Sequence, residues 1–251
     1  MNITIRIVTG LLLGICCQHE AQAGLSDYLE KLQQSATTPA APSGSVALSN
    51  SDMVAALKEA LDKGTQYAVQ NLGRDGGFLD NPAVRIPMPK SLSMVEKSLR
   101  ALHQDRLADE FIVSMNHAAE QAVPEAADLF TETIRNMTLD DAQGILSGPD
   151  DAATQFFRSH TEATLTQRML PIVNEAMDNT GVTSTYKTMM NSAGGLTGFL
   201  SGDATDLDSY VTRQALDGLF EMIAVEEKQI RENPVARTSD LMKKVFGAYS
   251  Q

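Results

Sequence analysis

One stretch of the sequence carries most of the side chains that could do chemistry. Asp109, Glu110, Asn116, His117 and Glu120 lie close together, and His117 and Glu120 are three residues apart, so a helix places them on one side. An imidazole and a carboxylate in that position make half of a metal site. Carboxylate-bridged di-metal bundles need Glu-x-x-His on two helices and further Glu residues from two others, and the sequence has one His-x-x-Glu without a partner. A solvated helix face is the simpler interpretation.

A second cluster follows Pro149. Helical spacing puts Asp151, Thr154 and Arg158 along one side of two turns, with His160 close by. An exposed threonine between an acid and a base is an arrangement that suits catalysis. The simpler interpretation is an acid stabilised by the helix dipole, together with a surface ion pair between Asp151 and Arg158.

Known catalytic and cofactor motifs are absent from the sequence. It contains no nucleophile elbow, phosphate-binding loop, dinucleotide fingerprint or zinc-binding His-Glu-x-x-His, and Asp75 and Asp80 are too sparse for a calcium loop. We therefore predict no catalytic residues, no cofactor and no metal ligands. The twelve methionines either line an adaptable pocket for a small hydrophobic ligand such as a lipid, or fill the core of a chain without tryptophan.

The first 23 residues have the pattern of a cleavable signal peptide. Arg6 precedes the apolar run from Ile7 to Cys17, which is too short to span a bilayer, and Ala21 and Ala23 are the small residues that a signal peptidase accepts. We predict export to the periplasm with cleavage after Ala23. Lipoprotein anchoring through Cys16 or Cys17 is disfavoured because the preceding residues are bulky.

The charge of the chain restricts its partners. The formal net charge is −12, and no cluster of Lys and Arg occurs, so we expect neither nucleic-acid binding nor attraction to anionic membrane surfaces. No later segment is long and apolar enough to span a membrane. Both cysteines fall in the predicted signal peptide, so the stability of the domain must come from its core.

Hydrophobic periodicity predicts an all-α fold. Residues 24–50 form a short amphipathic segment, Leu25–Gln34, and a flexible linker, and residues 51–251 form a single multi-helix domain. We expect about nine helices, one long central helix near the C-terminus, and a short extended Pro-rich segment at 84–89. The helices of the domain are expected at 51–72, 91–102, 106–123, 124–137, from 138 to Gly144 or Gly148, 149–177, 181–190, 206–233 and 238–249, with an irregular loop at 192–202. The first is expected to be capped by Asn50, Ser51 or Asp52 and to end at Gly73, and Thr138-Leu-Asp-Asp141 has the pattern of a capping box.

Several short motifs together resemble a known family. They are Asp75-Gly-Gly-Phe78 with Ile86-Pro-Met-Pro89, Met115-Asn116 with Ala118-Ala-Glu120, Asp151-Ala-Ala-Thr154, Tyr210-Val-Thr with Ala215-Leu-Asp-Gly-Leu-Phe220, Glu226-Glu227, Ile230-Arg-Glu-Asn-Pro234 and Val245-Phe-Gly247. This combination, from about Leu25 to Gly247, is similar to the family called domain of unknown function 4197. The resemblance implies a bacterial, exported, helical protein without an assigned activity. It also implies Arg at the place of His117, which argues against a metal ligand or general base there.

Three classes of function are compatible with the sequence. We favour a binding or protein-interaction module, because the Gly/Pro-rich segment at 73–89 and the linker at 35–50 suit recognition of a partner. Binding of a small hydrophobic ligand such as a lipid is an alternative within this first class, and a structural helical module is the second class. An enzyme would need its acidic, Arg and His side chains to converge in one cleft. The candidate cleft residues are Asn116, Glu120, Asp151, Arg158, Glu227 and Arg231, with His117 or His160.

Overall fold

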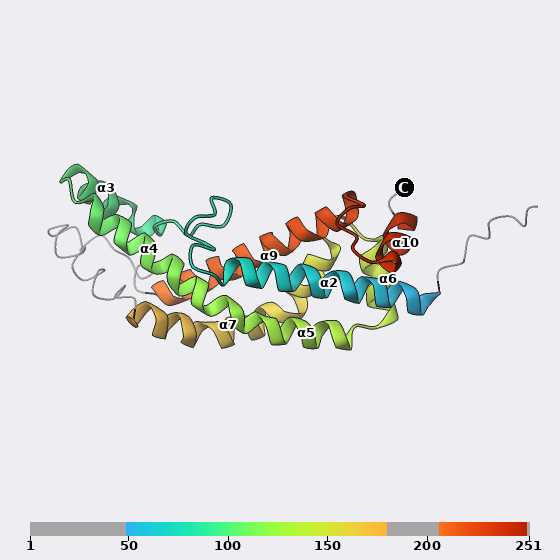
Figure 1. Ribbon diagram of the computed structural model, residues 1–251. Helices are drawn as coiled ribbons and strands as arrows, with labels where there is room; N and C mark the ends of the chain where they lie inside the picture. The colour runs from blue at the N-terminus through green and yellow to red at the C-terminus, as the bar shows by residue number, and fades with distance from the viewer. Residues whose placement is uncertain (1–48, 180–205, 250–251) are drawn as a thin grey trace, which may run out of the picture. The chain divides into compact units, whose positions relative to one another are not determined.

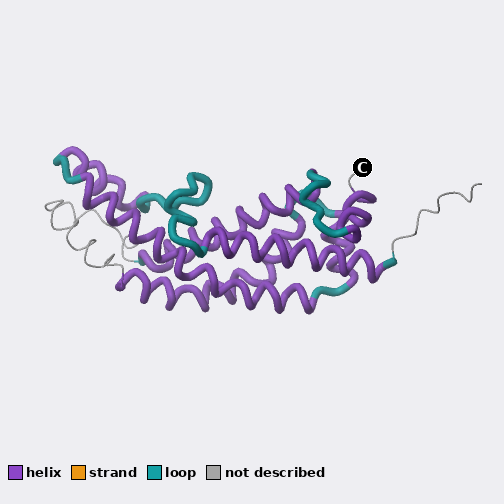
Figure 2. The backbone as a smooth tube through the Cα atoms, in the orientation of Figure 1, coloured by secondary structure: helices purple, strands orange, loops and turns teal. Residues whose placement is uncertain are grey.

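Helices make up the regular structure of the described part of the chain. The computed structural model describes residues 49–179 and 206–249, and no residue in these two ranges belongs to a β-strand (Figure 2). The all-α prediction is confirmed there. The helices in chain order, with η for a 3-10 helix, are α2 (Asn50–Leu72), η1 (Lys90–Leu92), α3 (Ser93–Ala101), α4 (Asp105–Ala122), η2 (Val123–Glu125), α5 (Ala126–Asn136), α6 (Leu139–Ser147), α7 (Ala152–Asn179), α9 (Leu207–Glu232) and α10 (Asp240–Tyr249).

Some predicted features lie outside the described residues. They are the signal peptide, the amphipathic segment at 25–34, the linker up to residue 48, the helix expected at 181–190, and the loop at 192–202. The chain divides into Met1–Ala47 and Leu48–Gln251, and all the described helices belong to the second unit. Within the two described ranges, no helix combines the length and the hydropathy that crossing a lipid bilayer requires.

Helix α2 follows from the spacing of its apolar residues. Met53, Leu57, Leu61 and Val69 are all buried, and the helix ends at Gly73, whose N–H donates to the carbonyl of Val69. The predicted N-terminal cap at residues 50–52 is wrong. Ser49 caps the helix, because its hydroxyl accepts a hydrogen bond from the N–H of Asp52 at 3.1 Å.

Helix α9 occupies the central position predicted for it. It contacts α7, α2 and α4, and Figure 1 shows it running beside α2. Its buried residues, among them Val211, Leu219 and Phe220, therefore cover more than one side of the helix. The Asp206 side chain caps its start by accepting from the N–H of Ser209 at 3.0 Å.

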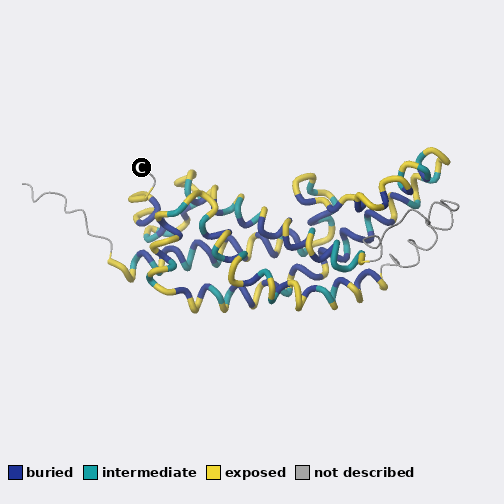
Figure 3. The backbone as a smooth tube through the Cα atoms, turned by 180° about the vertical axis from the view of Figure 1, so that it is seen from behind, coloured by how far each residue is buried: buried dark blue, intermediate teal, exposed yellow. Residues whose placement is uncertain are grey.

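Aromatic side chains from three helices join the core. The ring of Phe130 on α5 packs edge-on against Phe157 of α7, with centroids 5.1 Å apart, and against Phe220 of α9 at 6.3 Å. Figure 3 shows buried and exposed residues alternating along the long helices, as expected for helices that face both neighbours and solvent. Helix α7 continues through Pro171.

The capping box predicted at the start of α6 is present. The Thr138 hydroxyl accepts from the N–H of Asp141 at 3.2 Å, and the Asp141 carboxylate accepts from the N–H of Thr138 at 2.9 Å. The Thr138 hydroxyl also donates to the Asp141 carboxylate at 2.7 Å. The hydrogen bonds that the carboxylate accepts, first from the Thr138 N–H and then from its hydroxyl, lower the pKa of the Asp141 carboxyl.

The segment between α2 and η1 is a long connection without helix or strand. Residues 85–89 do not pair with any other described segment as a strand, and Pro89 adopts φ −53° and ψ 140°. At its start Gly76 has φ +75°, a conformation that favours glycine, and a Cβ on Gly77 would collide with the carbonyls of Asn71 and Leu72. The two glycines therefore turn the chain back against the end of α2. We call residues 73–89 the anchored loop.

Candidate functional site

The anchored loop is held to α4 by the buried carboxylate of Glu120. The Glu120 residue is 3 % exposed, and its Oε1 accepts hydrogen bonds from the backbone N–H groups of Phe78 at 2.9 Å and Leu79 at 3.1 Å. Its Oε2 lies 2.8 Å from Nδ1 of His117. A buried carboxylate needs hydrogen bonds and an opposite charge to offset its desolvation, and this arrangement can supply both.

Asn116, one turn before Glu120, fixes the second half of the loop. Its side chain is fully buried, with Oδ1 accepting from the N–H of Ile86 at 2.8 Å and Nδ2 donating to the carbonyl of Ile86 at 2.9 Å. The same Nδ2 also donates to the Ile112 carbonyl at 2.7 Å. The side-chain amide of Asn116 thus forms with the backbone of Ile86 the pair of hydrogen bonds that a residue of a neighbouring β-strand would form.

Helix α9 supports the loop from another side. A Cβ on Gly218 would lie 2.8 Å from Cε1 of Phe78 and 3.1 Å from Cβ of Val84, so the missing side chain lets the loop pack closely. The Tyr210 hydroxyl donates to the Pro87 carbonyl at 3.0 Å. Burial raises the pKa of the Tyr210 phenol, partly offset by the charge of Arg213. The loop is therefore fixed in its middle and at its end.

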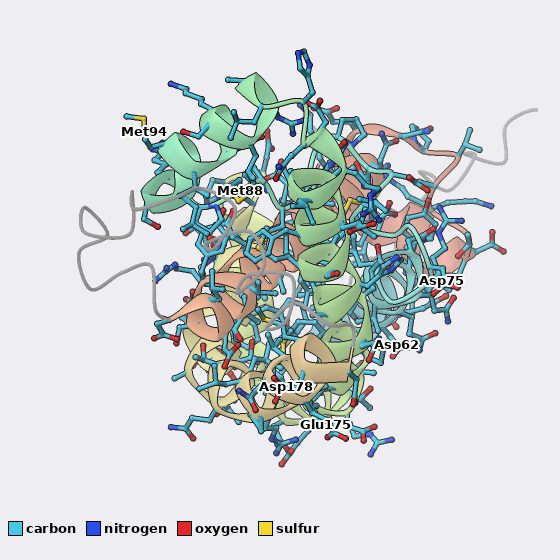
Figure 4. The ribbon with its side chains drawn as sticks, turned by 90° about the vertical axis from the view of Figure 1, so that its left-hand side faces the viewer. Asp62, Asp75, Met88, Met94, Glu175 and Asp178 are labelled. Atoms are coloured by element: carbon cyan, nitrogen blue, oxygen red, sulfur yellow. The ribbon has the colours of Figure 1, made fainter. Side chains whose placement is uncertain are left out.

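A third titratable side chain joins His117 and Glu120. Asp75, at the start of the loop, offers a carboxylate oxygen that lies within 4.8 Å of Nδ1 or Nε2 of His117 and of a Glu120 oxygen. Figure 4 labels Asp75 and Met88, from the two ends of the loop, on either side of α4 in that view. Asp75 is exposed and His117 is half-buried, so the cluster opens to solvent.

Glu227 forms a second buried polar centre, at the start of α7. Its Oε1 accepts from the Ala153 N–H at 2.9 Å, and its Oε2 accepts from the N–H and the hydroxyl of Thr154, both at 2.9 Å. Arg231, one turn later on α9, donates to Oε1 at 2.8 Å and to the Ile145 carbonyl at 2.8 Å. Glu227 caps α7 from another helix and Arg231 neutralises it.

The surface pairing predicted for Asp151 and Arg158 is wrong. Arg158 pairs with Glu162 at 3.1 Å and with Asp217 at 3.0 Å, and its guanidinium lies 4.6 Å from the ring centroid of Phe220. Asp151 accepts from the side chain of Gln155 instead. The expectation of an exposed Thr154 is also wrong, because Thr154 is 8 % exposed and donates to Glu227.

The candidate cleft residues do not share one cleft. Asn116 and Glu120 contact the anchored loop, Glu227 and Arg231 contact the start of α7, and Arg158 lies with Asp217 on the surface. His160 stacks its ring on Phe156 and is exposed. The expectation that the face with Asn116 and Glu120 is solvated is wrong as well, because both side chains are buried to reach the loop backbone.

Two hollows among the described residues bear on ligand binding. An apolar cavity lined by Leu57, Leu61, Ile223, Ile230 and Phe246, beside Glu227 and Arg231, has room of about 20 Å³, which suits one water molecule rather than a lipid chain. A surface groove of about 680 Å³ lies between the end of the anchored loop and the start of α9. It is lined by Pro87, Met88, Pro89, Lys90, Ser91, Asp206, Ser209, Tyr210, Arg213 and Gln214.

Comparison with known proteins gives one match. The family model described as protein of unknown function (DUF4197) covers residues 47–247, from before α2 to within α10. Comparison with curated proteins and with solved structures gives no match. The matched range includes the anchored loop, both buried carboxylates and the groove. The chain belongs to the DUF4197 family.

Proposed function

We propose that this chain is a periplasmic binding module, exported by its N-terminal segment, that presents the anchored loop as a preformed recognition surface for another protein. The observation that carries the proposal is the use of two buried side chains, Asn116 and Glu120, to hold loop backbone. Fixing a loop before binding reduces the entropy lost when a partner docks. The exposed side chains of the loop, such as Asp80, Pro82 and Arg85, then keep defined positions.

The groove beside the loop suits a segment that carries acidic residues. Lys90 and Arg213 both line it, and neither forms an ion pair among the described residues. The one acid in its lining, Asp206, caps α9, and hydrogen bonds from Ser209 lower the pKa of its carboxyl. In a chain with a net charge of −12, this local excess of positive charge favours a carboxylate-bearing partner.

The enzyme and lipid-binding alternatives have less support. An enzyme needs converging groups, and the candidate side chains contact three different parts of the fold. A lipid site needs a larger apolar cavity than the one between α2, α9 and α10. Of the methionines in the described ranges, Met53, Met115, Met169 and Met242 are buried in the core, which accounts for them as packing residues.

Peptide display tests the proposal. Short random peptides are selected against the purified protein, and enriched peptides are then titrated against the wild type and the double variant Lys90→Glu/Arg213→Glu. We expect enriched peptides to be acidic and to bind the double variant at least about tenfold more weakly, a loss of about 1.4 kcal/mol.

The matched control is Arg106→Glu/Lys228→Glu, which makes the same change in net charge. Both residues are exposed and lie outside the groove lining. The control should bind the peptides like the wild type. The proposal fails if no peptide is enriched, or if the two double variants weaken binding equally, since that would assign the effect to overall charge.

A further inference from the structure

Asp75, His117 and Glu120 bring one imidazole and two carboxylates together from two separate segments. Asp75 comes from the anchored loop, whereas His117 and Glu120 lie on one side of α4. We propose that, in this chain, these three side chains bind a divalent transition-metal ion, with Zn²⁺ the best-suited probe. The resemblance implies Arg at the place of His117 in related chains, so the site is proposed for this chain and not for its family. The inference does not depend on the groove, whose lining residues are different.

The carboxylate of Glu120 is already oriented for this role. Its Oε1 is occupied by the N–H groups of Phe78 and Leu79, so Oε2 is directed toward His117 and is the oxygen available to a cation. Metal-binding carboxylates are commonly fixed by such hydrogen bonds to the oxygen that does not face the ion. The burial of Glu120, with 3 % exposure, also protects that oxygen from competing water.

The distances are compatible with coordination. A zinc ion with bonds of about 2.0–2.1 Å holds neighbouring tetrahedral ligand atoms about 3.3 Å apart. Nδ1 of His117 and Oε2 of Glu120 are 2.8 Å apart, and all three ligand atoms lie within 4.8 Å of one another. The longer separations involve the exposed Asp75 side chain, which has the freedom to rotate toward the ion.

The ligand set selects the class of metal. An imidazole nitrogen with two carboxylates suits Zn²⁺ and similar transition ions, while Mg²⁺ and Ca²⁺ prefer oxygen ligands alone. Three protein ligands leave at least one coordination position for water or for a group from a partner. Since Asp75 is exposed, that position faces solvent.

A bound ion would link the loop to α4 at a further point. The hydrogen bonds from Phe78, Leu79 and Ile86 fix the middle and end of the loop, and Asp75 precedes them. The turn that carries Asp75 depends on Gly76, with φ +75°, and a side chain there would collide with Asp80. Metal binding would therefore order the start of the loop.

Calorimetric titration of the full chain with Zn²⁺ tests the proposal. We expect one ion per chain, no displacement by millimolar Mg²⁺, and at least about tenfold weaker binding in Asp75→Asn and in His117→Arg. His117→Arg is informative because arginine keeps a cation that can pair with Glu120 but does not coordinate Zn²⁺. Circular dichroism should show that both variants fold like the wild type without metal.

The matched controls are Asp128→Asn and His160→Arg, which make the same chemical changes at exposed positions outside the cluster. They should bind Zn²⁺ like the wild type. The proposal is overturned if the protein binds no Zn²⁺. It is also overturned if binding is unaffected by Asp75→Asn and His117→Arg, because the ion would then be held by other acidic side chains.

Discussion

Glu120 on α4 and Glu227 on α9 are both buried carboxylates that accept backbone N–H groups from a distant part of the chain, but their partners differ. Glu227 is paired with Arg231, whose side chain is 14 % exposed and also donates to the Ile145 carbonyl. Glu120 is paired with His117, whose side chain is 36 % exposed, and Asp75 lies beside them. The Glu227 centre is closed by the permanent positive charge of Arg231, and the Glu120 centre is open to solvent.

The difference separates a centre whose carboxylate oxygens are all used within the fold from one that leaves an oxygen facing an accessible side chain. The two oxygens of Glu227 accept from Ala153, Thr154 and Arg231, so both are used by groups of the fold itself. Glu120 uses one oxygen for the loop and directs the other toward an accessible histidine. Burial of a carboxylate therefore does not by itself indicate a functional site. The informative property is whether the residues that contact the carboxylate can give up that contact to a ligand.

Removal of Glu227 should have the largest effect on stability. Glu227→Ala leaves the Arg231 guanidinium, with 14 % of its side chain exposed, without its carboxylate partner. We expect the free energy of unfolding to fall by about 3–5 kcal/mol, measured by urea denaturation. Glu232→Ala, at an exposed ion pair on the same helix, should change it by less than about 0.5 kcal/mol. Equal losses in the two variants would show that the Glu227–Arg231 pair stabilises the fold no more than an exposed ion pair does.

Removal of Glu120 should cost less. Glu120→Ala leaves the N–H groups of Phe78 and Leu79 without an acceptor, but the exposed part of His117 can be hydrated. We expect a loss of about 1–3 kcal/mol. Glu120→Gln, which keeps an acceptor oxygen, should recover most of it in the same urea titration. A loss for Glu120→Ala as large as that for Glu227→Ala would remove the distinction between the two centres.

Asp141 extends the comparison to a carboxylate cap near the surface. Its pKa is lowered in the folded state by hydrogen bonds from Thr138, so its contribution to stability is present above the unfolded value of about 3.9 and is lost as pH falls through the lower folded value. Asp141→Asn should therefore cost about 0.5–1 kcal/mol at pH 7, and the difference from wild type should shrink below about pH 3.9. Urea titrations across that range measure it. A constant difference would contradict the assignment.

Surface charge pairs should contribute least. A double-mutant cycle between Arg158 and Asp217 should give a coupling energy of about 0.2–1 kcal/mol, because both side chains are substantially exposed. The cycle between Arg158 and Asp151 should give about zero, since Asp151 accepts from Gln155. Coupling of Arg158 to Asp151 rather than to Asp217 would restore the pairing expected from helical spacing.

Local features of the fold could be predicted from the sequence. The apolar spacing in α2 and α9, the end of α2 at Gly73 and the capping box between Thr138 and Asp141 depend on residues within a few positions of each other. Helical periodicity and caps act over that range, so the sequence is sufficient. The capping residue of α2 was predicted too late in the chain, because several adjacent residues, Ser49 among them, have side chains that can cap a helix.

The polar centres could be predicted only in part. His117 and Glu120 were predicted to share one side of a helix, but that face was predicted to be solvated, with no metal ligands. Asp75 was not joined to them, because a turn at Gly76 and Gly77 brings it there from another segment. The burial of Thr154 could not be predicted for the same reason, since its partner Glu227 lies on a different helix. One signal was available: Glu120 falls among buried alanines on α4, where a solvated carboxylate is not expected.

Hydrogen exchange at the amides of Phe78, Leu79 and Ile86 tests most directly whether buried side chains of α4 hold the loop. In the wild type, these N–H groups should exchange slowly. In Glu120→Ala, exchange should accelerate at Phe78 and Leu79 by at least about tenfold, equivalent to about 1.4 kcal/mol, while Ile86, bound by Asn116, changes less. Fast exchange at all three amides in the wild type would contradict a preformed loop, and with it the recognition surface proposed for this protein.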